Sequence, residues 1–225
     1  MPRHLRSIPI VAALTVLVAG CTGRPTAPAM TPSDPAPVAS SATAAVSLLG
    51  WCWRYRDIDR YPGVFADDLV GFAAAGDSVG GIAPESWARE QELVATSRIF
   101  VGDAIHPHVS KLTSSFDVSS GELAESLPAH SNRWHRTLIV PVDIRATLDL
   151  SSGFRRTYHV AEVFRFHLVR GDSAVIPVDL AMQGVRSDST RWYLWRWEDL
   201  TLSPPATSSD GSVPTTWRAL KQLFL

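Results

Sequence analysis

Hydrophobic and polar residues alternate along several long stretches in the second half of the chain. Every second residue is apolar over residues 138–149, and the same period of two runs over residues 158–168 and 191–201. Such a period places successive side chains on opposite faces of a strand. With a fourth predicted strand over residues 109–118, the pattern predicts an antiparallel meander with one apolar and one mostly polar face.

The first half of the chain has a helical period instead. Val46, Leu49 and Trp53 recur at helical spacing, and an adjoining stripe includes Cys52 and Tyr55. This spacing predicts an amphipathic helix near the start of the folded domain.

Three further elements complete the prediction. A short helix interrupted by Pro62 precedes a strand over residues 69–73. The next helix should present Trp87, Val94 and Val101, which are spaced seven apart, on one face. A closing helix is predicted over residues 217–223. Helices followed by a bent antiparallel sheet that they cover define an α+β fold.

The N-terminus has the pattern of a secretory signal. A basic head is followed by an apolar run over residues 8–19, which is too short to span a bilayer. The residues before Cys21 are Val18-Ala19-Gly20, and this stretch resembles the lipobox of bacterial lipoproteins. The resemblance implies cleavage before Cys21, acylation of its sulfur and a durable membrane anchor. The alternative is an ordinary secreted protein with a stray cysteine.

Composition divides the chain into three parts. Residues 1–20 are the predicted signal, residues 21–43 form a Pro/Ala/Ser-rich tether, and residues 44–225 form one domain. The formal net charge of −1 becomes −3 when the two signal arginines are removed, so nothing indicates nucleic-acid binding. We expect a cell-envelope location, at the outer membrane if the host has one, because Thr22 replaces the aspartate that in this family signals inner-membrane retention.

The domain resembles the nuclear transport factor two-like superfamily. The resemblance rests on the order of elements, on the helix start at residues 87–90 and on the Trp-Arg-Trp-Glu-Asp run at residues 195–199. It implies a cone-shaped fold with a pocket between a concave sheet and the helices. The superfamily contains both enzymes and non-enzymatic domains, and no catalytic motif carries over residue by residue.

Glu162 stands out because it lies on the apolar face of its strand, between Val160 and Phe164. A carboxylate in such a place must be paired, hydrogen-bonded or protonated. Asp199, on the predicted face of Tyr193, Trp195 and Trp197, is the second weak catalytic candidate. The predicted pocket consists of Tyr55, Tyr158, Glu162, Trp195 and Trp197. The alternative reading is that Glu162 has a structural role and that the aromatic residues build the core.

Other motifs have simpler interpretations. Residues 76–80 match G-x-S-x-G, but the expected strand-to-helix turn of a hydrolase is absent from the pattern, which favours a glycine-rich turn. His106-Pro107-His108 lacks further ligands and is interpreted as a loop, so no metal and no cofactor are predicted. Cys52 is expected to be a buried lone thiol.

Two functional hypotheses follow. The first is a lipid-anchored, non-catalytic envelope domain that binds a small molecule, a peptide or a partner protein, with a homodimer compatible with the sequence. The second is an isomerase, dehydratase or cyclase that uses Glu162 or Asp199 as a general base. The fold alone does not distinguish them.

Overall fold

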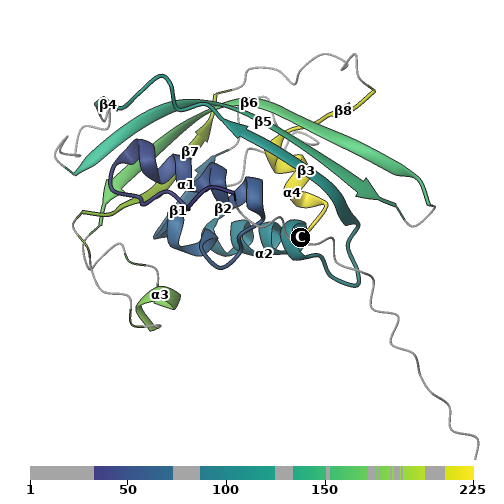
Figure 1. Cartoon of the computed structure of the whole chain (residues 1–225), viewed down its shortest axis with the longest axis horizontal. Coiled ribbons are helices and arrows are strands. Elements are labelled where there is room, and N and C mark those ends of the chain that lie inside the picture. Colours follow the sequence, from purple (N-terminus) through teal and green to yellow (C-terminus); the bar gives the residue numbers. More distant parts are fainter. Residues whose placement is uncertain are drawn as a thin grey trace, which may run out of the picture.

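A strongly bent sheet arches over two main helices (Figure 1). The computed structural model describes residues 33–72, 87–124, 134–150, 153–171, 176, 178–182, 184, 188, 190–200 and 211–225. Cys21 and the 76–80 motif lie outside these residues. Within the described ranges, no helix combines the length and apolar character needed to cross a membrane.

Four neighbouring strands form the predicted meander. They are β3 (His108–Phe116), β5 (His135–Asp149), β6 (Arg155–Arg170) and β7 (Trp192–Asp199), and each pairs antiparallel with the next. The ladder between β5 and β6 extends from the His135–Val169 pair to the Asp149–Arg155 pair. The apolar residues of the alternating pattern therefore face the concave side of this sheet, and the polar residues between them face the convex side.

The rest of the sheet adds two parallel pairings to the predicted antiparallel meander. Strand β1 (Phe65–Phe72) pairs parallel with β7, and β8 (Val213–Pro214) pairs parallel with β6. Two short strands, β2 (Trp87–Ala88) and β4 (Leu123–Ala124), pair antiparallel with β1 and β5. Parallel pairing is accessible to β1 and β7 because a long stretch of chain separates them, whereas a tight hairpin enforces antiparallel pairing.

Helix α1 (Ala42–Tyr55) lies under the concave face, as predicted. Its first turn is capped by the Ser41 hydroxyl, which accepts a hydrogen bond from the backbone N–H of Ala44 at 3.0 Å. The helix ends at Arg56, which has a φ of 53°. The residues of both predicted stripes are buried: Val46, Leu48, Leu49, Cys52, Trp53 and Tyr55.

The other helices are η1 (Tyr61–Val64), a single 3₁₀ turn, and α2 (Arg89–Val101), α3 (Val178–Met182) and α4 (Trp217–Gln222). The predicted face of α2 is wrong, because Val94 and Val101 are 43 % and 50 % exposed. The buried face of this helix carries Glu92, Ala95, Thr96, Ile99 and Phe100.

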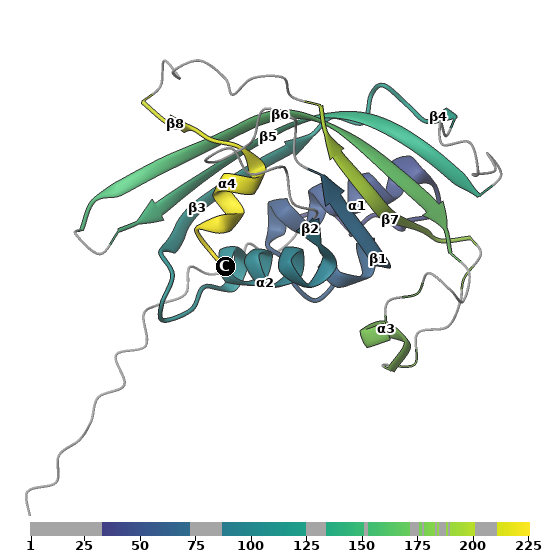
Figure 2. The same cartoon turned by 180° about the vertical axis from the view of Figure 1, so that it is seen from behind.

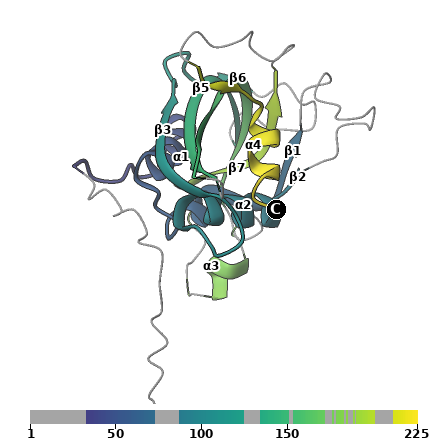
Figure 3. The ribbon, with the colours of Figure 1, turned by 90° about the vertical axis from the view of Figure 1, so that its right-hand side faces the viewer.

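The closing helix also differs in detail. Leu223 is exposed, whereas Lys221 and Phe224 are buried beside Trp217 and Leu220. In Figures 2 and 3, α4 lies against the concave side of the sheet, close to α2. Both corrections have one cause: charged residues occupy buried helix positions, which hydrophobic periodicity assigns to the surface.

Part of the predicted tether contacts the domain. Ala39 is buried, and its carbonyl accepts a hydrogen bond from the Trp192 backbone N–H at 2.9 Å. The carbonyl of Asp34 accepts from the Trp51 indole N–H at 3.3 Å. The packed chain therefore extends before residue 44, the predicted start of the domain.

The space under the sheet is filled by aromatic side chains. The Trp217 ring lies 4.7 Å from Trp53, 4.8 Å from Trp197 and 5.8 Å from Phe164, centroid to centroid. The fold is thus the predicted α+β class, with helices on the concave side of a bent, unclosed sheet. This is the arrangement that the resemblance to the nuclear transport factor two-like superfamily implies.

Candidate functional site

Glu162 is buried on the concave face, where it is only 3 % exposed. Its two carboxylate oxygens accept hydrogen bonds from the backbone N–H of Trp217 at 3.2 and 3.1 Å. Trp217 is the first residue of α4, so the carboxylate meets a backbone donor that the helix itself leaves without a partner. Glu162 thereby fixes the start of the closing helix on the sheet.

A β-bulge changes the predicted face of β7. His167 pairs with Arg196 and Leu168 pairs with Leu194, so Trp195 is the extra residue. Trp195 lies on the convex face with His135 and His167, at ring distances of 6.3 and 6.0 Å.

The bulge separates the residues that were predicted to share a face. Trp197 and Asp199 remain on the concave face, opposite Phe166 and Phe164. Tyr193 pairs with Val169 and stacks with the Arg191 guanidinium at 5.4 Å, on the convex side. The prediction that Tyr193, Trp195, Trp197 and Asp199 share one face is therefore wrong, because the bulge inverts the alternation.

The remaining predicted pocket residues lie apart. The Tyr55 hydroxyl is 3.1 Å from the Ser33 hydroxyl, and Tyr158 pairs with Val213 of β8. Trp197 packs against Phe164 and Trp217 in the core. Two cavities of the described part of the chain, one beside residues 36–40 and one between Lys111 and Arg145, are lined by none of the five predicted pocket residues. The structure does not gather the predicted pocket.

A buried ion pair that the hydrophobic pattern did not predict connects α2 with α4, the helix whose first backbone N–H Glu162 binds. The Lys221 ammonium is 2.5 Å from Glu92 Oε1, and both side chains are completely buried. The same ammonium lies over the Trp53 and Trp217 rings, at 4.8 and 4.6 Å from their centroids. Burial lowers the Lys221 pKa to about 8, although the Glu92 charge opposes the shift.

Hydroxyl and indole groups complete the surroundings of Glu92. Its Oε1 accepts hydrogen bonds from the hydroxyls of Tyr61 and Thr96, and its Oε2 accepts from the Trp87 indole N–H at 3.0 Å. Burial and the neighbouring Glu92 charge hold the Tyr61 pKa well above its usual value. Both carboxylate oxygens of Glu92 therefore accept hydrogen bonds. Such bonds offset the cost of burying a charged group.

The local sequence explains how this cluster assembles. Glu92 and Thr96 are one turn apart on α2, and Trp217 and Lys221 are one turn apart on α4, so each pair shares a helix face. The cluster joins α2, η1 and α4 beneath the sheet. Both charged side chains are completely buried and bonded to each other, so this geometry supports a role in holding α2 and α4 together.

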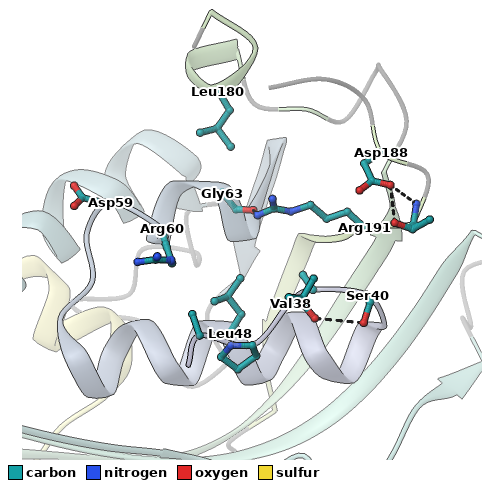
Figure 4. A pocket seen from close by; sticks show the side chains of 13 residues that line it. Val38, Ser40, Leu48, Asp59, Arg60, Gly63, Leu180, Asp188 and Arg191 are labelled. Atoms are coloured by element: carbon teal, nitrogen blue, oxygen red, sulfur yellow. Dashed lines mark hydrogen bonds between the residues drawn. The ribbon is translucent and has the colours of Figure 1, made fainter. Parts of the chain in front are cut away.

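A groove of about 520 Å³ opens at another side of the domain (Figure 4). One wall is residues 36–40, part of the predicted tether, and Leu48 of α1 lies beneath it. The opposite side is formed by Asp59, Arg60, Gly63 of η1, Leu180 of α3 and the stretch with Asp188, Thr190 and Arg191.

The groove carries both charge signs. Arg191 extends across it and donates from Nη2 to the Gly63 carbonyl at 3.0 Å, while its buried Nε has no hydrogen-bond partner among the described residues (Figure 4). Asp188 accepts from the Thr190 N–H and hydroxyl, and these bonds lower its pKa. Arg60 pairs with Asp57 at 2.6 Å. The groove thus offers donors and acceptors to a polar ligand.

The histidines of the His-Pro-His motif have separate carboxylate partners. His106 Nδ1 lies 2.6 Å from Asp103, and His108 Nδ1 lies 3.2 Å from Asp149. Across the described ranges, no group of three or more metal-ligating side chains is found. Cys52 is buried as predicted, and burial raises its thiol pKa to about 12, which keeps it protonated.

Comparisons with known proteins yield distant structural similarities. No protein-family model and no curated protein matches the chain. The Kfla4162 protein of Kribbella flavida is 13 % identical with a TM-score of 0.43, over 79 % of this chain and 92 % of its own. A conserved protein from Planctomyces limnophilus is 13 % identical with a TM-score of 0.41, over 68 % and 88 %.

A type 2 hexachlorocyclohexane dehydrochlorinase (LinA) is also similar, at 13 % identity and a TM-score of 0.39, over 73 % of this chain and 86 % of its own. At such scores the fold class rests on the elements and sheet register described above.

Proposed function

We propose that this is a lipid-anchored protein of the cell envelope whose domain binds a small polar molecule without chemically changing it. The groove of Figure 4 carries the proposal. Its volume of about 520 Å³ falls within the range of roughly 300–1,000 Å³ that is typical of small-molecule sites. Arg60 and Arg191 would recognise acidic groups of the ligand, and Asp59 and Asp188 would recognise donors.

The site geometry favours binding over catalysis. A general base must come within hydrogen-bond reach of the proton that it removes. Both oxygens of Glu162 accept from the Trp217 N–H, and Glu162 does not line the groove. The aromatic side chains and Lys221 occupy the space where a cone-shaped enzyme would hold its substrate.

Ligand binding is tested by native mass spectrometry of the full protein, extracted from its host envelope in mild detergent. We expect a retained small molecule, and we expect Arg60→Gln to reduce its occupancy. Arg54→Gln removes an exposed arginine of α1 that does not line the groove, so it should retain the ligand. A protein without any bound molecule, or equal occupancy in both variants, would contradict the proposed site.

The anchor is supported by the lipobox resemblance at Cys21. We expect the wild-type protein to fractionate with membranes and to carry the mass of a lipid, and the Cys21→Ser variant to be released. Retention of that variant at the membrane without lipid would contradict the proposed anchor while leaving the groove untouched.

A further inference from the structure

A second, smaller cavity lies on the convex face of the sheet, far in sequence from the groove. It has a volume of about 230 Å³ and is formed by three neighbouring strands. Strand β3 contributes Lys111 and Thr113, β5 contributes Arg145 and Thr147, and β6 contributes Thr157. Residues 211–212, just before β8, close one side.

The strand register places two positive charges at diagonal positions on neighbouring strands. Lys111 pairs with Thr147 and Thr113 pairs with Arg145, so the two cations are diagonal neighbours on adjacent strands. Long side chains at diagonal positions are within reach of each other, so both cations can approach one ligand. A bulge at Ser110, immediately before Lys111, sets this register, and bulges often occur where a strand must aim a side chain at a site.

Hydroxyl groups line the rest of the cavity. Thr147 and Thr157 share one hydrogen bond of 2.9 Å between their hydroxyls. Since one hydroxyl donates in that bond, the proton of the other is available to a ligand. Thr113 and the largely buried Ser212 add two more hydroxyls to the lining.

The described residues place a carboxylate beside the cavity but not in its lining. Asp143, which is not among the lining residues, lies 3.6 Å from Arg145 Nε and also pairs with His159 at 2.7 Å. Lysine on an edge strand such as β3 also discourages pairing with other chains. That role does not account for the hydroxyl groups of the lining.

We propose that this cavity is an anion site that binds a phosphate group, held by Lys111, Arg145 and the surrounding hydroxyls. A tetrahedral oxyanion accepts several hydrogen bonds at once, and arginine and lysine are its usual partners in proteins. The phosphate group could belong to a soluble phosphate ester or to a phospholipid headgroup. This site is independent of the ligand proposed for the groove.

Binding is tested by calorimetry on the full chain carrying Cys21→Ser, so that no lipid anchor contributes. The probes are inorganic phosphate and glycerol 3-phosphate at constant ionic strength, and vesicles of phosphatidylglycerol compared with vesicles of phosphatidylcholine. We expect saturable binding that weakens by at least about tenfold in Lys111→Gln/Arg145→Gln, because charge-assisted hydrogen bonds are lost. Saturation by the soluble probes, or by phosphatidylglycerol vesicles alone, distinguishes the two sources.

The control is Arg156→Gln, which removes an exposed cation one residue before Thr157 on the same strand. Circular dichroism should show that all variants remain folded. The proposal is overturned if no probe binds the Cys21→Ser chain, if the double variant binds equally well, or if Arg156→Gln weakens binding as much as the double variant.

Discussion

Ion pairs on the concave and convex sides of this sheet differ in their exposure to solvent. Under the sheet, Lys221 and Glu92 are 2.5 Å apart and completely buried. On the other side, Arg155 and Asp149 are 2.9 Å apart, but their side chains are 73 % and 37 % exposed. The distances are similar, whereas the surrounding dielectric is not. Energetic importance therefore follows burial and the completeness of hydrogen bonding rather than the separation of the charges.

The largest effect is expected from Lys221→Met, which leaves the Glu92 carboxylate buried without its cation. Loss of one partner of a buried pair destabilises a protein by about 3–5 kcal/mol. Urea unfolding followed by tryptophan fluorescence measures the change. Lys111→Met is the matched control, because the chain has two lysines and Lys111 is exposed. Equal and small losses of stability for the two variants would show that the buried and the exposed lysine contribute alike.

The burial of Lys221 should also make the stability of the protein depend on pH. The Lys221 pKa falls from 10.5 to about 8 on folding, so the unfolded state binds more protons between these values and stability rises with pH. Relative to the double variant Lys221→Met/Glu92→Gln, the free energy of unfolding of the wild type should rise by on the order of 2 kcal/mol between pH 7 and 9.5. Denaturant unfolding at several pH values tests this. If the difference in free energy of unfolding between the wild type and the double variant stayed constant or fell with pH, the Lys221 pKa would not be lowered.

Glu162→Ala should have an intermediate effect. It removes the acceptor of the Trp217 N–H at the start of α4, and an unsatisfied buried donor costs about 1.5 kcal/mol. Glu162→Gln retains an amide oxygen and should be closer to the wild type. Thermal unfolding compares the two variants. If Glu162→Gln were as damaging as Glu162→Ala, the negative charge rather than the hydrogen bond would hold the helix.

The smallest effect is expected from Arg155→Gln on the convex side. An exposed ion pair is screened by solvent, so stability should change by less than about 0.5 kcal/mol. The measurement is again urea unfolding, now with added salt in a second series. A loss comparable to that of Lys221→Met would mean that the two faces do not differ in the proposed way.

Periodicity predicted the strands of the meander and the first helix because their side chains alternate between core and solvent. Residues 138–149 are regular, and β5 follows them closely. The same reasoning failed at Trp195, since a bulge adds one residue and inverts the faces beyond it. A bulge is decided by pairing with the neighbouring strand, which a single strand's sequence does not reveal.

The candidate sites were harder to predict than the fold. Glu162 was identified because it interrupts an apolar face. Glu92 and Lys221 are far apart in sequence, and each looks like an ordinary surface residue of a helix until the helices are packed together. A usable signal was the position of Lys221 between Leu220 and Phe224, on the stripe that begins at Trp217. The groove combines loops and helix ends, for which no periodic pattern exists.

The contacts of the segment before α1 bear on where the groove operates. The chain is already engaged at Ser33, through Tyr55, and residues 36–40 form a groove wall. If Cys21 carries the lipid, as we propose, the chain from Cys21 to Ser33 reaches at most about 40 Å when fully extended. The groove would then sample only a thin layer beside the bilayer, and its ligand would be captured from that layer rather than from the whole compartment.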